Sequence, residues 1–434
     1  MRIIMAGMMV LGMGCLGTFG AEPAVTAAPP PYVWATAYHV LPETHNNESG
    51  YFSLNEGLDG KVYVGTAKYG VNSYLVEFDP VKTSQRVVVD VHALCGLSAT
   101  GFAAQAKIHT RNYVAPSGRI YVGSKQGYAQ KGEDPDSYPG GYVIRYDPAT
   151  GQATNLGMPM PKQGVIDVTA DESRGLVYVV TCEDQHWMLG STEQAKPYRE
   201  LGPMLAPYAI TLVDSNGCAH AVTRDGRIAR YDPAADKVLV RDIREGDRTW
   251  TTNDLKSGPH NWVLAKDRRH AYLIRMRDPA LIRIDLGSVD ERVVKAENLG
   301  PLLEGKNFDS RGALDVAPDG RVYALVRRDN QTGFGGGFLH HLVRYDPAIG
   351  RAENLGVLAI RNPDFFHGLS LDAKGAVDPA TGVKHPWTHG YHRLPDGTLT
   401  PMHNHMAMIV GRDGKTLYAT ILYPFTLLKI DLNP

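Results

Sequence analysis

Cysteine and net charge are both scarce in this sequence. It has four cysteines in 434 residues, too few for a disulfide scaffold. Its 45 lysines and arginines nearly balance its 46 aspartates and glutamates. The formal net charge of −1 argues against a nucleic-acid-binding protein, although a local basic cleft could still bind an anionic ligand. The Gly-x-Ser-x-Gly motif of a hydrolase nucleophile is also missing.

Long apolar runs are missing except at the N-terminus. Residues 1–21 combine a basic start, an apolar run and an end of small residues, which predicts a signal peptide. The remainder, residues 22–434, is then secreted or periplasmic, and no other segment is apolar enough to span a membrane. Cys15 suggests a lipid anchor, but Gly12 stands where a lipidation signal has leucine, so we expect none.

Turn residues and tyrosines are plentiful, and they recur in a repeated unit. Each unit has an Asp-Gly turn or a relative, an apolar strand with a tyrosine, and a strand that ends in Tyr-Asp-Pro or similar. Seven such units run through the chain, with turns near residues 59, 117, 174, 217, 268, 319 and 413. Short strands in regular repeats predict an all-β protein, a seven-bladed β-propeller.

One strand is left over at the start of the repeats. Residues 32–40 read as a strand, while the last unit ends at the C-terminus with no spare strand after it. We therefore predict that the N-terminal strand completes the last blade, which removes open sheet edges. Residues 22–434 then form a single domain, which we expect to be a monomer.

Equivalent positions in the repeats identify one face of the propeller. Counting back twelve residues from the repeated tyrosine, or from the residue in its place, gives a set at the start of the innermost strands: Tyr51, His109, Tyr208, His260, Arg311 and, with one extra turn residue, His405. Such residues suit acid–base chemistry and anion binding. The alternative is that they only bond to the backbone or line a wet channel.

Two segments also carry a resemblance to a known family. Residues 107–128 read KIHTRNYVAPSGRIYVGSKQGY, and residues 137–160 begin SYPGGYVIRYDP. Over 107–160 the chain resembles seven-bladed propeller polysaccharide lyases of the ulvan-lyase type and related secreted propellers. The resemblance implies a histidine base, a tyrosine acid and an arginine that neutralises a uronate carboxylate. His109 matches the motif histidine, but Lys125 stands where many members have a second histidine.

The roles that follow are those of a β-elimination on an anionic polysaccharide. The resemblance implies these roles, and the equivalent repeat positions supply the candidates for them: His109 or His260 as the base, Tyr208 as the acid and Arg311 as the cation. Further candidates for contact with the substrate are Tyr51 (also an alternative acid), Arg111 and Lys125 (substitute cations), Tyr128 and His405.

Histidines near the C-terminus suggest a metal. Imidazoles are good zinc ligands, and residues two apart on a strand share one face. The candidate ligands are His389, His392, His403 and His405. The ion would be structural, or it would belong to the catalytic centre; a plain surface loop is the alternative.

Two other functions remain open at this stage. The same propeller mouth could bind a glycan or a partner protein without catalysis. A metal-dependent hydrolase or lactonase would instead need the histidine cluster to reach the channel and leave an open metal position. An acid–base pair with a cation beside it favours the lyase.

Overall fold

The computed structural model describes residues 27–44, 48–255, 261–275, 278–288, 292–305, 308–365, 390–402, 406–422 and 424–432. Within these ranges, the side chains of 42, 48–51, 275, 278–279 and 308–312 are left out. The predicted signal peptide therefore lies outside the described residues.

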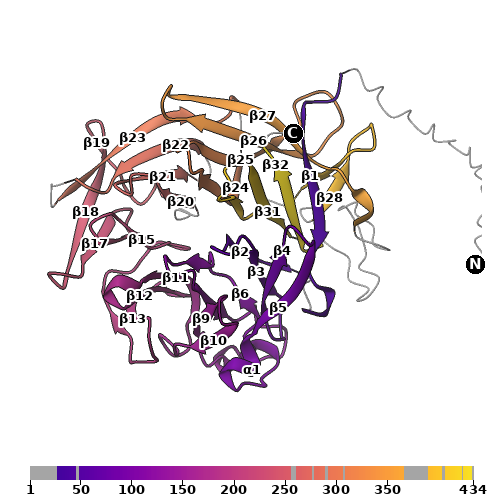
Figure 1. The fold of residues 1–434 in the computed structure, drawn as a ribbon. Coiled ribbons are helices and arrows are strands. Elements are labelled where there is room, and N and C mark those ends of the chain that lie inside the picture. The colour runs from indigo at the N-terminus through magenta and orange to yellow at the C-terminus, as the bar shows by residue number, and fades with distance from the viewer. Residues whose placement is uncertain are drawn as a thin grey trace, which may run out of the picture.

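The chain forms short antiparallel meanders arranged in a ring around one axis (Figure 1). The first meander is β2 (Glu48–Glu56), β3 (Val62–Ala67), β4 (Tyr74–Asp79) and β5 (Ser84–Asp90). The second has an inner strand in two pieces, and comprises β6 (Lys107–Ile108), β7 (Tyr113–Val114), β8 (Ile120–Lys125), β9 (Val143–Asp147) and β10 (Gln152–Asn155).

The next two meanders follow the same order. One contains β11 (Gly164–Asp171), β12 (Leu176–Cys182), β13 (Trp187–Ser191) and β14 (Arg199–Glu200). The other contains β15 (Leu212–Val213), β16 (Ala219–Val222), β17 (Ile228–Asp232) and β18 (Lys237–Glu245), with β19 (Arg248–Thr249) paired to β18.

The C-terminal half repeats this pattern. Its strands are β20 (Asn261–Leu264), β21 (His270–Arg275), β22 (Asp278–Asp285) and β23 (Val293–Pro301), then β24 (Phe308–Val316), β25 (Val322–Asp329), β26 (Phe338–Asp346) and β27 (Arg351–Ile360). The strands after these are β28 (Tyr391–Arg393), β29 (Leu399–Pro401), β30 (Met408–Val410), β31 (Thr416–Ile421) and β32 (Thr426–Asp431).

Helices in the described part of the chain are short. The α-helix α1 (Val91–Cys95) is capped at its N-terminus by Asp90, whose carboxylate accepts a hydrogen bond from the backbone N–H of Ala93. Single 3-10 turns occur at η1 (Pro42–Thr44), η2 (Gly101–Ala103), η3 (Pro135–Ser137), η4 (Glu172–Arg174) and η5 (Pro363–Phe365). No helix in the described ranges is long and apolar enough to cross a bilayer.

The repeated motifs take the predicted local structure. In the Asp-Gly turn before β3, Gly60 has a φ of 74°, which favours glycine. In the Tyr-Asp-Pro type of turn, the Asp79 carboxylate accepts hydrogen bonds from the backbone of Val81 and Lys82. The repeated tyrosine is buried, and in Tyr63 the hydroxyl donates to a carboxylate oxygen of Asp59 at 2.8 Å.

The N-terminal strand closes the last meander, as predicted. The strand β1 (Tyr32–His39) pairs antiparallel with β32 and opposes Ala37 to Leu428. It also runs parallel to β27, and Asn362 bonds both backbone groups of Ala37. Both flanks of β1 are therefore paired, and the two ends of the described chain hold each other (Figure 1).

The core lies between neighbouring meanders. The second strand of a meander is covered on both faces, so β3 and β8 are buried at every position. Cys95, Cys182 and Cys218 are free thiols, and the chain where the structure describes it contains no disulfide.

Candidate functional site

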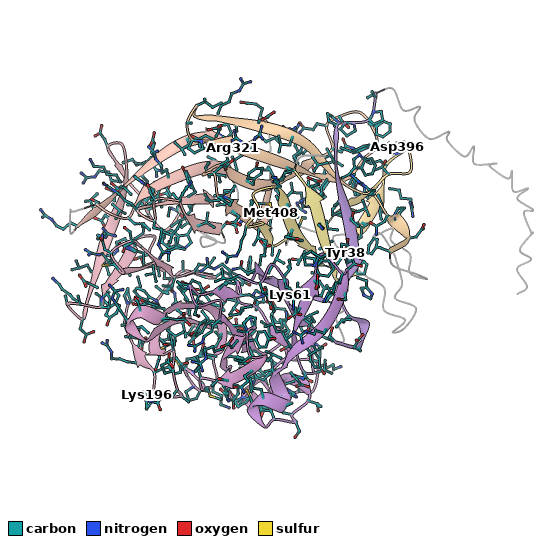
Figure 2. All side chains as sticks on the ribbon, viewed as in Figure 1. Tyr38, Lys61, Lys196, Arg321, Asp396 and Met408 are labelled. Atoms are coloured by element: carbon teal, nitrogen blue, oxygen red, sulfur yellow. The ribbon has the colours of Figure 1, made fainter. Side chains whose placement is uncertain are left out.

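Inner strands of the ring surround a cavity of about 130 Å³ on the axis. Its lining includes apolar side chains such as Phe52 and Met408, the latter labelled in Figure 2. Polar side chains also line it: Asn55, Arg111, Tyr113, Asn261 and Asp315. These residues come from β2, β20, β24, β30 and the segment through β7, so distant parts of the chain share one cavity.

Two of the predicted catalytic residues meet beside this cavity. His109 directly follows β6 and is 4% exposed, and Tyr208 precedes β15. Their rings stack with centroids 6.0 Å apart and an interplanar angle of 25°. Phe52, which lines the cavity, packs edge-on against both rings at 5.3 and 6.0 Å. The structure therefore brings together the predicted base and the predicted acid.

Lys125, the last residue of β8, supplies a buried positive charge on the same face. Its Nζ lies 3.3 Å from Cys182 Sγ and 3.8 Å from an oxygen of Glu183. A side chain at Gly164 would collide with the Lys125 Cβ, so the missing side chain makes room for the lysine. Burial opposes the ammonium charge, but Cys182 and Glu183 outweigh it and raise the Lys125 pKa above its ordinary value.

The environment of Tyr208 keeps its phenol protonated near neutral pH. Burial raises the Tyr208 pKa, and the charge of Lys125 offsets only part of that rise. A protonated phenol beside an imidazole is able to donate a proton while the imidazole accepts one. The pair is therefore suited to general acid–base chemistry.

Arg111 lines the cavity, but its guanidinium already has a carboxylate partner. Its Nε donates to Asp167 Oδ1 at 3.2 Å, and Nη2 donates to the Thr211 carbonyl at 3.2 Å. Burial raises the pKa of Asp167, and Arg111 counteracts the rise. An anionic ligand would have to compete with this buried aspartate, so Arg111 is better suited to joining inner strands than to binding substrate.

Tyr51 and Arg311 lie at equivalent positions on two inner strands, β2 and β24. Their side chains lie outside the described residues. In β2 the pairing with β3 shifts between Ser49 and Leu54. In β24 the pairing with β25 shifts in the same way between Asp309 and Leu314. Their inner strands are irregular at the positions that the repeat made equivalent.

The predicted zinc ligands are mostly untested. His389, His403 and His405 lie outside the described residues, and so does His260, the alternative base. His392 is on β28, where its ring lies against the backbone of Gly337. Within the described ranges, no three His, Cys, Asp or Glu side chains form a group that could hold a metal. The zinc site stays a prediction.

The candidate site residues named from the sequence include none of Phe52, Cys182 and Glu183. A second comparison between the repeats, made at the end of the second strand, would have predicted that Cys182 lies near Lys125. Lys125 follows Tyr121 by four residues, and Cys182 follows Tyr178 by four residues. Both therefore end the second strand of their meanders, at the same mouth of the ring.

Comparisons with known proteins support the fold. No protein-family model and no curated protein matches the chain. The virginiamycin B lyase from Staphylococcus aureus is a similar solved structure, with 9% identity and a TM-score of 0.52 over 92% of this chain and 99% of that chain. The β-propeller domain of Cps50 (Swd1) from Myceliophteria thermophila has 12% identity and a TM-score of 0.52 over 93% and 99%.

A third similar structure is a fungal alcohol oxidase of the AA5 family in complex with copper. It has 11% identity and a TM-score of 0.51 over 94% of this chain and 76% of that chain. Likeness at such low identities bears on the fold alone. The chain is an all-β protein with the fold of a β-propeller.

Proposed function

We propose that the protein is a secreted propeller lyase that cleaves a uronic-acid-containing glycan by β-elimination. The observation that carries this proposal is the stacked pair of His109 and Tyr208 at the edge of the axial cavity, with the buried cation Lys125 on the same face. The proposal includes seven blades, one for each sequence repeat, and a monomeric protein.

The reaction would begin with neutralisation of the substrate carboxylate. The C5 proton of a uronic acid becomes acidic only when the charge of the carboxylate beside it is offset. We assign this task to Lys125, because Arg111 is engaged by Asp167 and the side chain of Arg311, the cation first predicted, lies outside the described residues. Glu183, whose side chain is 64% exposed, now lies against Lys125 and would give way to the incoming carboxylate.

Proton transfers would then follow on the two stacked rings. His109 takes the C5 proton, the C–H electron pair forms the C4–C5 double bond, and the C4–O4 bond breaks. Tyr208 protonates the departing O4, so atoms and charges balance. Return of the proton from His109 to Tyr208 restores the resting state. The raised Tyr208 pKa favours this direction, because the phenol holds its proton until the leaving group needs it.

A non-catalytic glycan-binding propeller is the second candidate. Tyr128 favours it, because this tyrosine is 60% exposed beside the same mouth and offers a flat face to a sugar ring. Binding alone, however, does not require an imidazole and a protonated phenol in contact. The metal-dependent hydrolase has no described ligand group in its favour.

The test is an elimination assay with purified protein. Polysaccharides that contain uronic acid are incubated with the wild type, and the ultraviolet absorbance of the new conjugated double bond is followed. We expect activity that falls by about 10²–10⁴-fold in His109→Ala. His270→Ala is the matched control, because His270 pairs with Asp267 at the surface of another meander. Folded wild-type protein that is silent on every uronate polymer would refute the lyase.

A further inference from the structure

A buried amine and a buried thiol lie in contact at one mouth of the ring. Lys125 Nζ is 3.3 Å from Cys182 Sγ, and the two residues are 7% and 6% exposed. They come from neighbouring meanders, since Lys125 ends β8 and Cys182 ends β12. Cys182 is a free thiol, and a free thiol is open to oxidation.

Gly164 is the residue that lets these two side chains meet. It is the cross-strand partner of Cys182 at the end of β12. A Cβ atom on Gly164 would lie 2.6 Å from Lys125 Cβ and 2.5 Å from Gln126 Oε1. The Lys125 side chain therefore packs on bare backbone beside Cys182. An attacking atom that is held about 3–3.5 Å from its target needs little reorganisation to react, and the contact between Nζ and Sγ falls in this range.

Oxidation of the thiol would turn Cys182 into a target for this amine. Hydrogen peroxide converts a thiolate to a sulfenic acid: an S–O bond forms, the O–O bond breaks and hydroxide leaves. A sulfenic sulfur then condenses with a nitrogen nucleophile. Here the lone pair of Lys125 Nζ attacks Cys182 Sγ, so an S–N bond forms, the S–O bond breaks and water leaves.

A carboxylate lies where the lysine must lose its proton. Glu183 Oε1 is 3.8 Å from Lys125 Nζ, and the Glu183 side chain is 64% exposed, so it is able to pass the proton on to water. Burial opposes the ammonium charge, and Cys182 and Glu183 raise the Lys125 pKa against it. Oxidation to a neutral sulfenic acid removes the contribution of Cys182, so the amine becomes easier to deprotonate.

We propose that Cys182 and Lys125 form an oxidative modification site, in which peroxide joins Sγ to Nζ by a covalent bond that thiols reduce. A second equivalent of peroxide would place one oxygen between the two atoms, giving N–O–S and water. Either product removes the ammonium charge and ties β8 to β12. The site does not depend on the proposed function, because it uses only the contact between the two side chains.

Cys218 supplies a matched comparison within the same chain. It is 3% exposed, and its Sγ accepts a hydrogen bond from Arg230 Nη2 at 3.1 Å. A guanidinium stays protonated in proteins, so Arg230 has no free lone pair with which to attack sulfur. Oxidation of Cys218 should therefore yield sulfur acids, whereas oxidation of Cys182 should yield the cross-link.

The experiment is peptide mapping of the whole protein after exposure to hydrogen peroxide. Trypsin should release residues 120–131, uncut after Lys125, joined to residues 175–199. The mass of the joined pair is that of the two peptides less two hydrogen atoms, with one further oxygen for N–O–S. Treatment with a thiol reductant before digestion should restore cleavage after Lys125.

The pH dependence of the reaction gives a second readout. Burial raises the Cys182 pKa, and Lys125 opposes the rise, so little thiolate is present near neutral pH. Because the thiolate is the species that peroxide oxidises, the initial rate should increase about tenfold for each pH unit. A rate that does not change with pH would contradict oxidation through the Cys182 thiolate.

Three variants locate the cross-link. Lys125→Arg keeps the positive charge but removes the amine, and Cys182→Ser removes the thiol, so neither protein should form the joined peptide. Lys82→Arg is the matched control, because Lys82 is an exposed lysine in the β4–β5 turn and its replacement should leave the yield at the wild-type level. Wild-type protein in which peroxide oxidises Cys182 without joining it to Lys125, or does not reach Cys182, would overturn the site.

Discussion

Two histidines of this propeller, His109 and His220, show opposite uses of one side chain. His220 is fully buried inside its meander, and its Nε2 lies 2.9 Å from Asp214 Oδ2. Its Nδ1 lies 3.1 Å from Nη2 of Arg241, so a neutral ring that donates to the aspartate and accepts from the arginine fits both contacts. His109 is also buried, but it stacks on aromatic rings at the edge of a cavity.

The difference lies in what surrounds each ring and in its access to the cavity. Burial lowers the His220 pKa while Asp214 opposes the shift, and the Asp214 pKa is lowered by His220 and by backbone donors despite burial. That network is closed to ligands, and it occupies the place where other repeats bury a tyrosine. A histidine with both ring nitrogens fixed stabilises the fold, whereas one stacked against a protonated phenol at a cavity is placed for proton transfer.

The largest effect on activity is expected from a change in the His109–Tyr208 pair, which leaves the network of His220 unaltered. Tyr208→Phe keeps the ring that packs on His109 and Phe52 but removes the proposed proton donor. We expect elimination activity to fall by about 10²–10⁴-fold with a stability change below about 1 kcal/mol. Tyr113→Phe is the control, since it removes a different phenol from the lining of the same cavity. Equal losses in both variants would contradict the assignment.

The reciprocal change is made in the buried network of His220. His220→Ala leaves the buried Asp214 and Arg241 without the ring between them, and removing one partner from a buried ionic group costs about 3–5 kcal/mol. Urea unfolding should show this loss, while activity per folded molecule stays at the wild-type value. A His220→Ala protein of normal stability, or one that is folded but inactive, would erase the distinction between the two histidines.

The fold was largely predictable from local chemistry. The Asp-Gly turns, the buried tyrosines and the Asp-Pro turns each act over a few residues, so their repetition predicted the meanders. The closing strand was predictable because an unpaired edge needs a partner. The same repetition gave the register that placed His109 and Tyr208 at one mouth, although they lie in different meanders.

What the sequence did not reveal are contacts between meanders. Arg111 reads as a free cation, yet it reaches Asp167, 56 residues away, because the two inner strands are neighbours on the axis. Lys125 reaches Cys182 over a similar separation, through the ends of two second strands. Such pairs depend on the angle between blades and on strand irregularities, which no local motif encodes.

The buried carboxylate of Asp315 offers a further comparison, with that of Asp214, and the smallest expected effect. It lines the same cavity, and its two oxygens accept hydrogen bonds from the backbones of Val316 and Val410 at 2.8 Å. Burial raises its pKa from 3.8 to about 6, with Arg111 opposing the shift. Asp214 has the opposite shift because His220 and backbone donors hold its charge.

The sign of the pH dependence follows from these shifts. The folded protein binds the Asp315 proton more tightly than the unfolded chain, so the free energy of unfolding from this group should fall as pH rises from about 4 to about 6. Asp315→Asn should remove this falling contribution, about 1–2 kcal/mol after allowance for the open cavity. Urea unfolding of both proteins across this range measures the difference. If the free energies of unfolding of the two proteins change in parallel with pH, Asp315 ionises freely in the folded protein. Water in the cavity would then stabilise the charge of Asp315, as His220 stabilises the charge of Asp214.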